Sequence, residues 1–103
     1  MKLTAYNYLT SEEPTIFEGK EAEDIITKSI EDFLEDVEQD NWDIDEARAF
    51  RPILEELLED GYLEGKYPLE TFYKDAVFWV IEGEYYPPKE LIERIKEDKD
   101  LIW

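Results

Sequence analysis

One stretch of the chain, from Ser29 to Ala47, constrains the fold most, because it combines an apolar stripe with many acids and contains no base. No lysine or arginine lies between Lys28 and Arg48. The acids in this gap are Glu31, Asp32, Glu35, Asp36, Glu38, Asp40, Asp43, Asp45 and Glu46. Free carboxyl groups titrate near 4, so these side chains are ionised at neutral pH wherever water reaches them. The stretch must therefore bury one face and expose a strongly negative one.

Apolar residues recur at helical spacing from Lys20 to Val37. They are Ala22, Ile25, Ile26, Ile30, Phe33, Leu34 and Val37. Such a stripe is typical of a helix packed on a core. Acids fill the opposite face, interrupted by Lys28. We expect an amphipathic helix over residues 20–37, preceded by a strand over 2–9 and a short second strand over 15–17.

A second helix is expected to begin at Asp43. Asp43 followed by Glu46 matches a capping box, and Trp42 occupies the position of a hydrophobic staple. The apolar stripe continues across Pro52, which predicts a kink or break near Arg51. The helix should end at Gly61, a residue suited to a left-handed C-cap.

The segment from Pro68 to Gly83 is ambiguous. Its apolar residues fit a third helix that starts at Pro68, whereas the run VFWVI at 77–81 favours a strand, with Glu82 and Gly83 in a hairpin turn. Periodicity over the longer window favours the helix. A last helix is expected over residues 89–99, with Leu91, Ile92 and Ile95 inward.

The predicted fold is therefore a single domain, residues 1–103, that is mainly α: a compact bundle of about four helices with a short N-terminal β element. The alternative is an α+β fold with a hairpin around 76–86. A chain of 103 residues suits one core of modest size.

Several classes of function are disfavoured by residue types that are missing. The chain has no cysteine and no histidine, and so lacks the thiol nucleophile, the commonest general base and the commonest transition-metal ligand. It also lacks a nucleophile elbow and a phosphate-binding glycine loop. We predict no enzyme activity, no cofactor and no metal. The absence of cysteine, of a long apolar run and of a secretory leader favours the cytoplasm, that of the host cell if a phage encodes the protein.

The charge balance indicates the kind of partner. Acids outnumber bases by 29 to 11, which gives a formal net charge of -18, while 43% of the residues are hydrophobic and favour a folded chain. Such a surface repels nucleic acid and anionic membranes but attracts the basic channel of a nucleic-acid-binding protein. The predicted partner-binding residues are Glu31, Glu35, Glu38, Asp40, Asp43, Asp45, Glu55 and Glu59. The competing interpretation is an acidic face that only confers solubility.

In size, charge and missing catalytic residues, with acids at 31–46 and 55–64, the chain resembles the DNA-mimic inhibitors of phages and mobile elements, such as anti-CRISPR and antirestriction proteins. That resemblance implies a protein that blocks the nucleic-acid channel of a host-defence nuclease. The segment Glu84, Tyr85, Tyr86 and Pro87 before the last helix also resembles colicin DNase immunity proteins, in which tyrosines and nearby acids bind the nuclease. An immunity or antitoxin-type inhibitor is therefore the first alternative, and a generic acidic adaptor the second.

Overall fold

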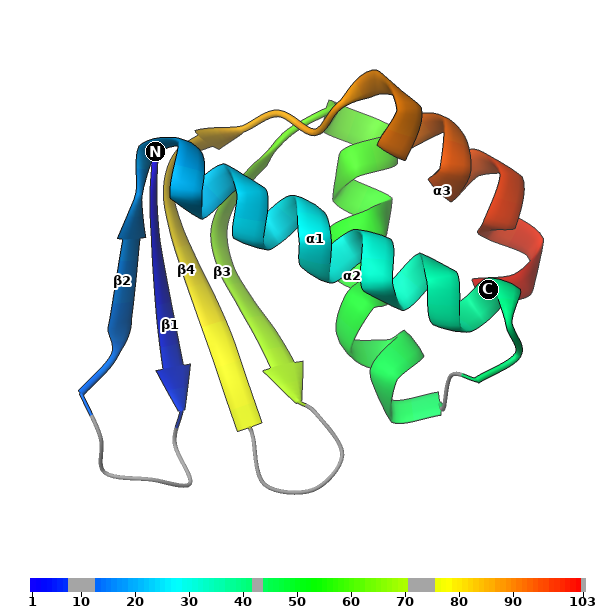
Figure 1. Cartoon of the computed structure of the whole chain (residues 1–103), viewed down its shortest axis with the longest axis horizontal. Helices are drawn as coiled ribbons and strands as arrows, with labels where there is room; N and C mark the ends of the chain where they lie inside the picture. The colour runs from blue at the N-terminus through cyan, green and yellow to red at the C-terminus, as the bar shows by residue number, and fades with distance from the viewer. Residues whose placement is uncertain (8–12, 42–43, 71–75, 103) are drawn as a thin grey trace.

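A computed structural model describes residues 1–7, 13–41, 44–70 and 76–102 (Figure 1). Within them lie four strands and three helices. In chain order these are β1 (Lys2–Asn7), β2 (Thr15–Glu18), α1 (Gly19–Glu38), α2 (Ile44–Asp60), β3 (Leu63–Glu70), β4 (Ala76–Tyr85) and α3 (Lys89–Ile102). The fold is α+β: one antiparallel sheet with helices packed on one of its faces.

The sheet has the strand order β2-β1-β4-β3, so β1 and β4 are central and β2 and β3 are edges. Leu3 pairs with Ile81, and Trp79 pairs with Tyr67. Because paired residues share a face of a sheet, these four side chains point the same way, and all are buried. This inner face supports the core. The opposite, outer face carries Lys2 and the residues paired with it, Glu18 of β2 and Glu82 of β4.

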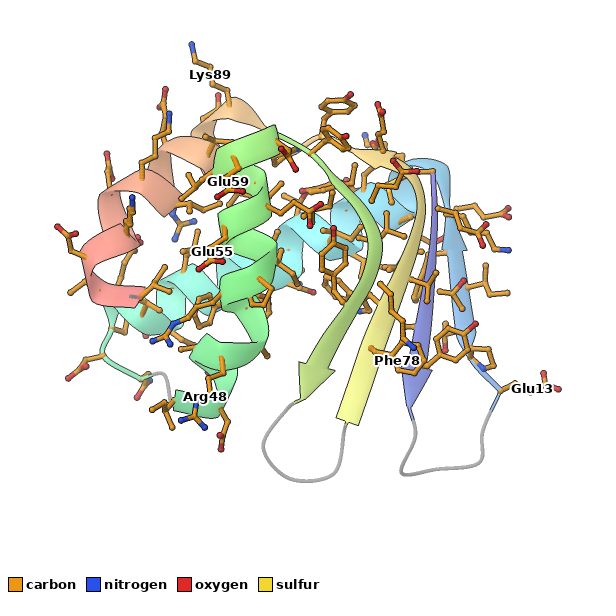
Figure 2. All side chains as sticks on the ribbon, turned by 180° about the vertical axis from the view of Figure 1, so that it is seen from behind. Glu13, Arg48, Glu55, Glu59, Phe78 and Lys89 are labelled. Atoms are coloured by element: carbon orange, nitrogen blue, oxygen red, sulfur yellow. The ribbon has the colours of Figure 1, made fainter. Side chains whose placement is uncertain are left out.

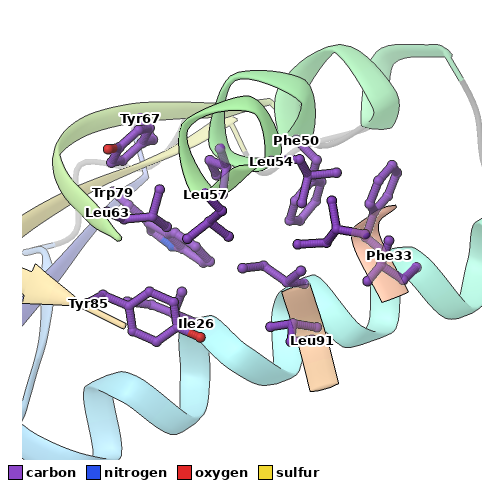
Figure 3. Packing of buried hydrophobic residues seen from close by; sticks show 14 of the residues in the cluster. Ile26, Phe33, Phe50, Leu54, Leu57, Leu63, Tyr67, Trp79, Tyr85 and Leu91 are labelled. Atoms are coloured by element: carbon purple, nitrogen blue, oxygen red, sulfur yellow. The ribbon is translucent and has the colours of Figure 1, made fainter. Parts of the chain in front are cut away.

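The core fills the space between the inner face of the sheet and the three helices (Figure 3). Phe33 of α1 and Phe50 of α2 stack with ring centroids 4.6 Å apart and planes 6° apart. Leu91 and Ile95 of α3 are buried in the same cluster. Figure 1 shows α1 crossing the sheet on the viewer's side, with α2 behind it and beside β3. The two long helices therefore face each other through their apolar stripes.

The predicted four-helix bundle is wrong, because the segment expected to form its third helix is part of the sheet. β3 and β4 form an antiparallel pair in which Pro68 lies opposite Phe78. Proline is tolerated there because β3 is an edge strand. The hairpin expected around 76–86 is also misplaced: Gly83 lies inside β4 at a φ of 86° rather than in a turn, and the chain reverses between β3 and β4.

The other helices follow the prediction closely. The helix expected over 20–37 is α1, and that expected over 89–99 is α3, one turn longer than predicted. α2 runs through Pro52 without a break. Gly61 has a φ of 79°, and its N–H donates to the Leu57 carbonyl at 3.0 Å, as expected of a C-cap. The capping box at Asp43 and the staple at Trp42 lie outside the described residues.

Polar contacts fix the elements to one another. The Arg51 Nε on α2 donates to the Ile102 carbonyl at 3.0 Å, near the end of α3. The Tyr67 hydroxyl on β3 donates to a Glu56 carboxylate oxygen on α2 and accepts from the Glu64 N–H at 3.3 Å. Burial, followed by the interaction with Glu56, raises the pKa of Tyr67 well above 10. These contacts hold α2 rigidly against both the sheet and α3.

Candidate partner-binding surface

The first group of predicted residues lies on the outward face of α1. Glu31 and Glu35 are exposed, whereas Phe33 and Leu34, which lie between them in sequence, are buried. Glu35 Oε1 accepts a hydrogen bond from Gln39 Nε2 at 3.2 Å. Among the described residues, neither Glu31 nor Glu35 has a cationic nitrogen within 4.0 Å. Their charges are therefore directed to solvent.

The C-terminus of α1 is unusually acidic. Asp40 is exposed and adopts a left-handed conformation, with a φ of 57°. The Asn41 N–H then donates to the Asp36 carbonyl at 2.8 Å, which closes the helix. Neither α1 nor α2 has a basic residue in its last turn. Acids there oppose the negative end of the helix dipole and cost stability, typically about 0.3–1 kcal/mol each.

The second group lies on α2. Glu55 and Glu59 are exposed on the side of α2 that faces the viewer in Figure 2. Asp45 is half-buried, and its Oδ1 lies 4.0 Å from Arg48 Nη1. Asp43 lies outside the described residues. Of this group, Glu55 and Glu59 are the carboxylates most accessible to a partner.

The two groups occupy different faces of the molecule. α1 and α2 meet through the Phe33–Phe50 stack, so the opposite sides of the two helices point away from each other. Figure 1 shows the molecule from the side of α1, and Figure 2 from the side of α2. The structure therefore separates Glu31 and Glu35 from Glu55 and Glu59 instead of joining them in one strip. The Cα atoms span 19 Å along the shortest axis of the molecule.

One predicted residue, Glu38, is engaged within the protein. Its Oε1 lies 3.4 Å from Arg94 Nη2 on α3. Beside it, Asp98 of α3 is only 8% exposed, and its Oδ2 has no hydrogen-bond partner among the described residues. Burial raises the pKa of Asp98. The nearby carboxylates of Glu38 and Glu97 raise this pKa further, whereas Arg94 lowers it. Glu38 and Asp98 belong to the α1–α3 junction as much as to the surface.

The tyrosines of the Tyr-Tyr-Pro segment differ in environment. Tyr85 is fully buried, its hydroxyl bonds to Thr27, and burial raises its pKa to about 12. Tyr86 is 59% exposed and packs at 5.7 Å against Tyr62. The hydrogen bond that Tyr86 donates to Glu84 raises the pKa of Tyr86. Only Tyr86 of this pair is available to a partner.

Nothing in the described part of the chain forms a metal cluster of three or more carboxylates. Among the same residues, no helix is long and apolar enough to cross a membrane. Comparison of the chain with protein-family models, with curated proteins and with solved structures gave no match.

Proposed function

We propose that this protein is a non-enzymatic inhibitor that mimics nucleic acid and occupies the basic nucleic-acid-binding channel of a host-defence nuclease, in the manner of anti-CRISPR or antirestriction proteins. The observation that carries the proposal is the set of exposed carboxylates on the outward faces of α1 and α2, among which Glu31, Glu35 and Glu59 have no ion-pair partner in the described structure. Lysine and arginine that bind phosphate also bind carboxylate.

The spacing of these groups supports the proposal. Glu31 and Glu35 are one helical turn apart, a rise of about 5.4 Å, and so are Glu55 and Glu59. Phosphates on one strand of duplex DNA are about 3.4 Å apart along the axis. A cationic groove that contacts every second phosphate would meet carboxylates at a comparable spacing on either helix. Because both helices are anchored in the core, the charges are held in place before binding.

The two-sided distribution refines the kind of partner. Duplex DNA presents a phosphate backbone on each of its two sides. This protein is a thin body whose Cα atoms span 19 Å along its shortest axis, with acids outward on α1 and on α2. Such a body suits a channel with basic walls on both sides better than a flat basic patch.

The acids at the helix C-termini favour a binding role over solubility alone. Solubility requires net charge but no particular position. Carboxylates in the last turns of α1 and α2 oppose the helix dipoles, and the same charge placed elsewhere would avoid that cost. A partner that supplies lysine and arginine to these sites would offset it.

The test compares two triple variants that carry the same change in charge. The first, E31Q/E35Q/E59Q, removes acids from α1 and α2; the control, E90Q/E93Q/E97Q, removes three exposed acids from α3, where lysines are interspersed. Each tagged protein is used to capture partners from the native host at low salt, and the captured protein is identified by mass spectrometry.

We expect the wild type and the control to capture the same nucleic-acid-binding protein and the first variant to lose it. Equal capture by both variants would show that net charge alone determines binding, and would contradict a role for these residues.

A second candidate is an immunity-type inhibitor of a basic nuclease toxin, which is favoured by the exposed Tyr86, packed on the half-buried Tyr62 and bonded to Glu84. Tyrosine is enriched among residues that dominate binding energy. Under this candidate, Y62A/Y86A abolishes capture and E31Q/E35Q/E59Q does not. The opposite result supports the mimic.

A further inference from the structure

The outer face of the sheet is a second surface with its own composition. By the strand register, the residues on this face are Lys2, Thr4, Tyr6, Ile16, Glu18, Lys66, Pro68, Glu70, Ala76, Phe78, Val80 and Glu82. Among the described residues, no helix packs on it: α1 and α2 both contribute to the core on the inner side. Phe78 is labelled in Figure 2, which views the sheet from the side opposite α1.

The centre of the outer face is apolar. The outward positions of the two central strands hold Thr4, which is 6% exposed, and Tyr6, Phe78 and Val80, which are half-buried; none of them is charged, and Ile16 on the neighbouring edge is 53% exposed. A solvated antiparallel face normally carries polar side chains at these positions. Adjoining apolar side chains that are partly exposed, as these are, form a patch of the kind that binding surfaces use.

The aromatic side chains on this face are already ordered. The rings of Tyr6 and Phe78 stack at 4.5 Å with planes 6° apart. The Lys66 ammonium lies 4.4 Å from the centroid of the Phe78 ring. This row extends from β1 across β4 to β3. A partner that packs on it orders few additional side chains, which lowers the entropic cost of binding.

The outer face also carries a smaller excess of acids over bases than the chain as a whole. Its two lysines stand against three glutamates, Glu18, Glu70 and Glu82, whereas the whole chain has 29 acids and 11 bases. Lys2 Nζ lies 3.9 Å from Glu82 Oε2. Within the described structure, Lys66 has no carboxylate oxygen within 4.0 Å. Two copies of the chain can approach here with less repulsion than through the acidic faces of α1 or α2.

We propose that the outer face is a dimer interface, on which a second copy of this chain packs sheet against sheet. This inference does not depend on the proposed function. The sheet has four strands about 4.8 Å apart, and each is about six residues long with a rise of about 3.4 Å per residue. The product of width and length gives a contact area of about 400 Å² per copy. The total of about 800 Å² is below the 1,200 Å² typical of stable complexes. The dimer is therefore weak and forms only at high protein concentration.

Charge complementarity selects the orientation. A two-fold axis along the strands places the β3 edge of one copy over the β2 edge of the other. Lys66 then lies across from Ile16 and within reach of Glu18 of the other copy, twice per dimer. This axis also places the two α2 helices at opposite ends of the interface. An axis across the strands would bring Glu55 and Glu59 of the two copies together and is disfavoured.

Sedimentation velocity of the purified full-length chain, over a wide range of concentrations and at two salt concentrations, tests the proposal. Added salt screens the repulsion between two bodies of charge -18 but leaves apolar burial intact. We therefore expect the dimer to strengthen with salt. The proposed inhibitor complex should instead weaken with salt, so the two proposals fail independently.

Two matched variants locate the interface. Ile16→Lys places a positive charge across from Lys66 of the other copy, at the edge of the contact. Leu101→Lys makes the same change at an equally exposed apolar residue on α3, since Ile16 is 53% and Leu101 57% exposed. I16K should weaken dimerisation by about tenfold or more, which is about 1.4 kcal/mol, and L101K should leave it unchanged. A chain that stays monomeric at every concentration and salt, or a dimer insensitive to I16K, overturns the proposal.

A charge swap tests the orientation. K66E and E18K should each weaken the dimer, and the double variant K66E/E18K should restore it, because the Lys66–Glu18 pair between copies is re-formed with reversed sign. Failure of the double variant to recover overturns the proposed axis.

Discussion

Replacing the buried Asp98 by asparagine should stabilise the protein at neutral pH. Asp98 is 8% exposed, and its Oδ2 has no partner in the described structure. An unsatisfied buried polar group costs about 1–3 kcal/mol, and a charged one costs more. Asparagine has the same shape, carries no charge and can donate its amide to the Glu38 carboxylate. We expect D98N to raise the free energy of unfolding by about 1 kcal/mol or more at pH 7.

The gain should depend on pH in a defined direction. The folded-state pKa of Asp98 is raised above 3.8, chiefly by burial and then by Glu38. The folded state therefore binds the Asp98 proton more tightly than the unfolded state, and the stability that this proton supplies is present below pH 3.8 and lost as the pH rises through the folded pKa. The advantage of D98N over the wild type should therefore grow as the pH rises from 3.8 through the folded pKa of Asp98, and should be complete above it.

Urea denaturation at a series of pH values measures this difference. D100N is the control, because Asp100 is an exposed acid on the same helix and loses the same charge. We expect D100N to change stability by less than about 0.5 kcal/mol, as surface substitutions usually do. A D98N variant that is less stable than the wild type at pH 7, or that matches D100N at every pH, would refute the reasoning.

Three further changes should alter stability measurably. Reversing two bases in R48E/R51E should lower the melting temperature by several degrees, because it makes the net charge more negative by four and breaks the contacts of both arginines; an unchanged melt would contradict this. Tyr67→Phe should cost about 1–2 kcal/mol in urea denaturation, because the Glu56 carboxylate loses its hydroxyl donor; equal stability would contradict it. Asp40→Gly should raise the free energy of unfolding by about 1 kcal/mol, since glycine adopts the left-handed φ of 57° without strain; a lower free energy of unfolding would contradict this.

The three helices were predictable because each has one apolar face and one charged face. Ile26, Ile30 and Phe33 on α1 are buried. Glu31, which follows Ile30, and Glu35, two residues after Phe33, are exposed. The 3.6-residue period is therefore visible directly in the sequence. The C-cap at Gly61 was predictable for a similarly local reason.

The segment that forms β3 and β4 was misread because β4 is apolar on both faces. Trp79 and Ile81 point into the core, but Phe78 and Val80 between them are also apolar and point outward. Alternation, the usual sign of a half-buried strand, is thereby lost, and the remaining residues fit a helical period by chance. The half-buried Phe78 and Val80 that obscured the strand lie on the face proposed as a dimer interface.

The acidic residues could be identified from the sequence, but their distribution could not. Periodicity places Glu35 opposite Phe33 on α1 and Glu55 roughly opposite Phe50 on α2. It does not show that Phe33 and Phe50 stack on each other, which is what directs the two acidic faces apart. The burial of Asp98 was likewise hidden, because its neighbours in the sequence are charged and exposed.

The most direct test of the mimic is competition for the captured partner between this protein and nucleic acid. The dissociation constant of the complex is measured from 50 mM to 500 mM salt, with and without duplex DNA or RNA that the partner binds. The account predicts that nucleic acid displaces the protein competitively and that affinity falls steeply with salt. Simultaneous binding of both, or an affinity independent of salt, would contradict it.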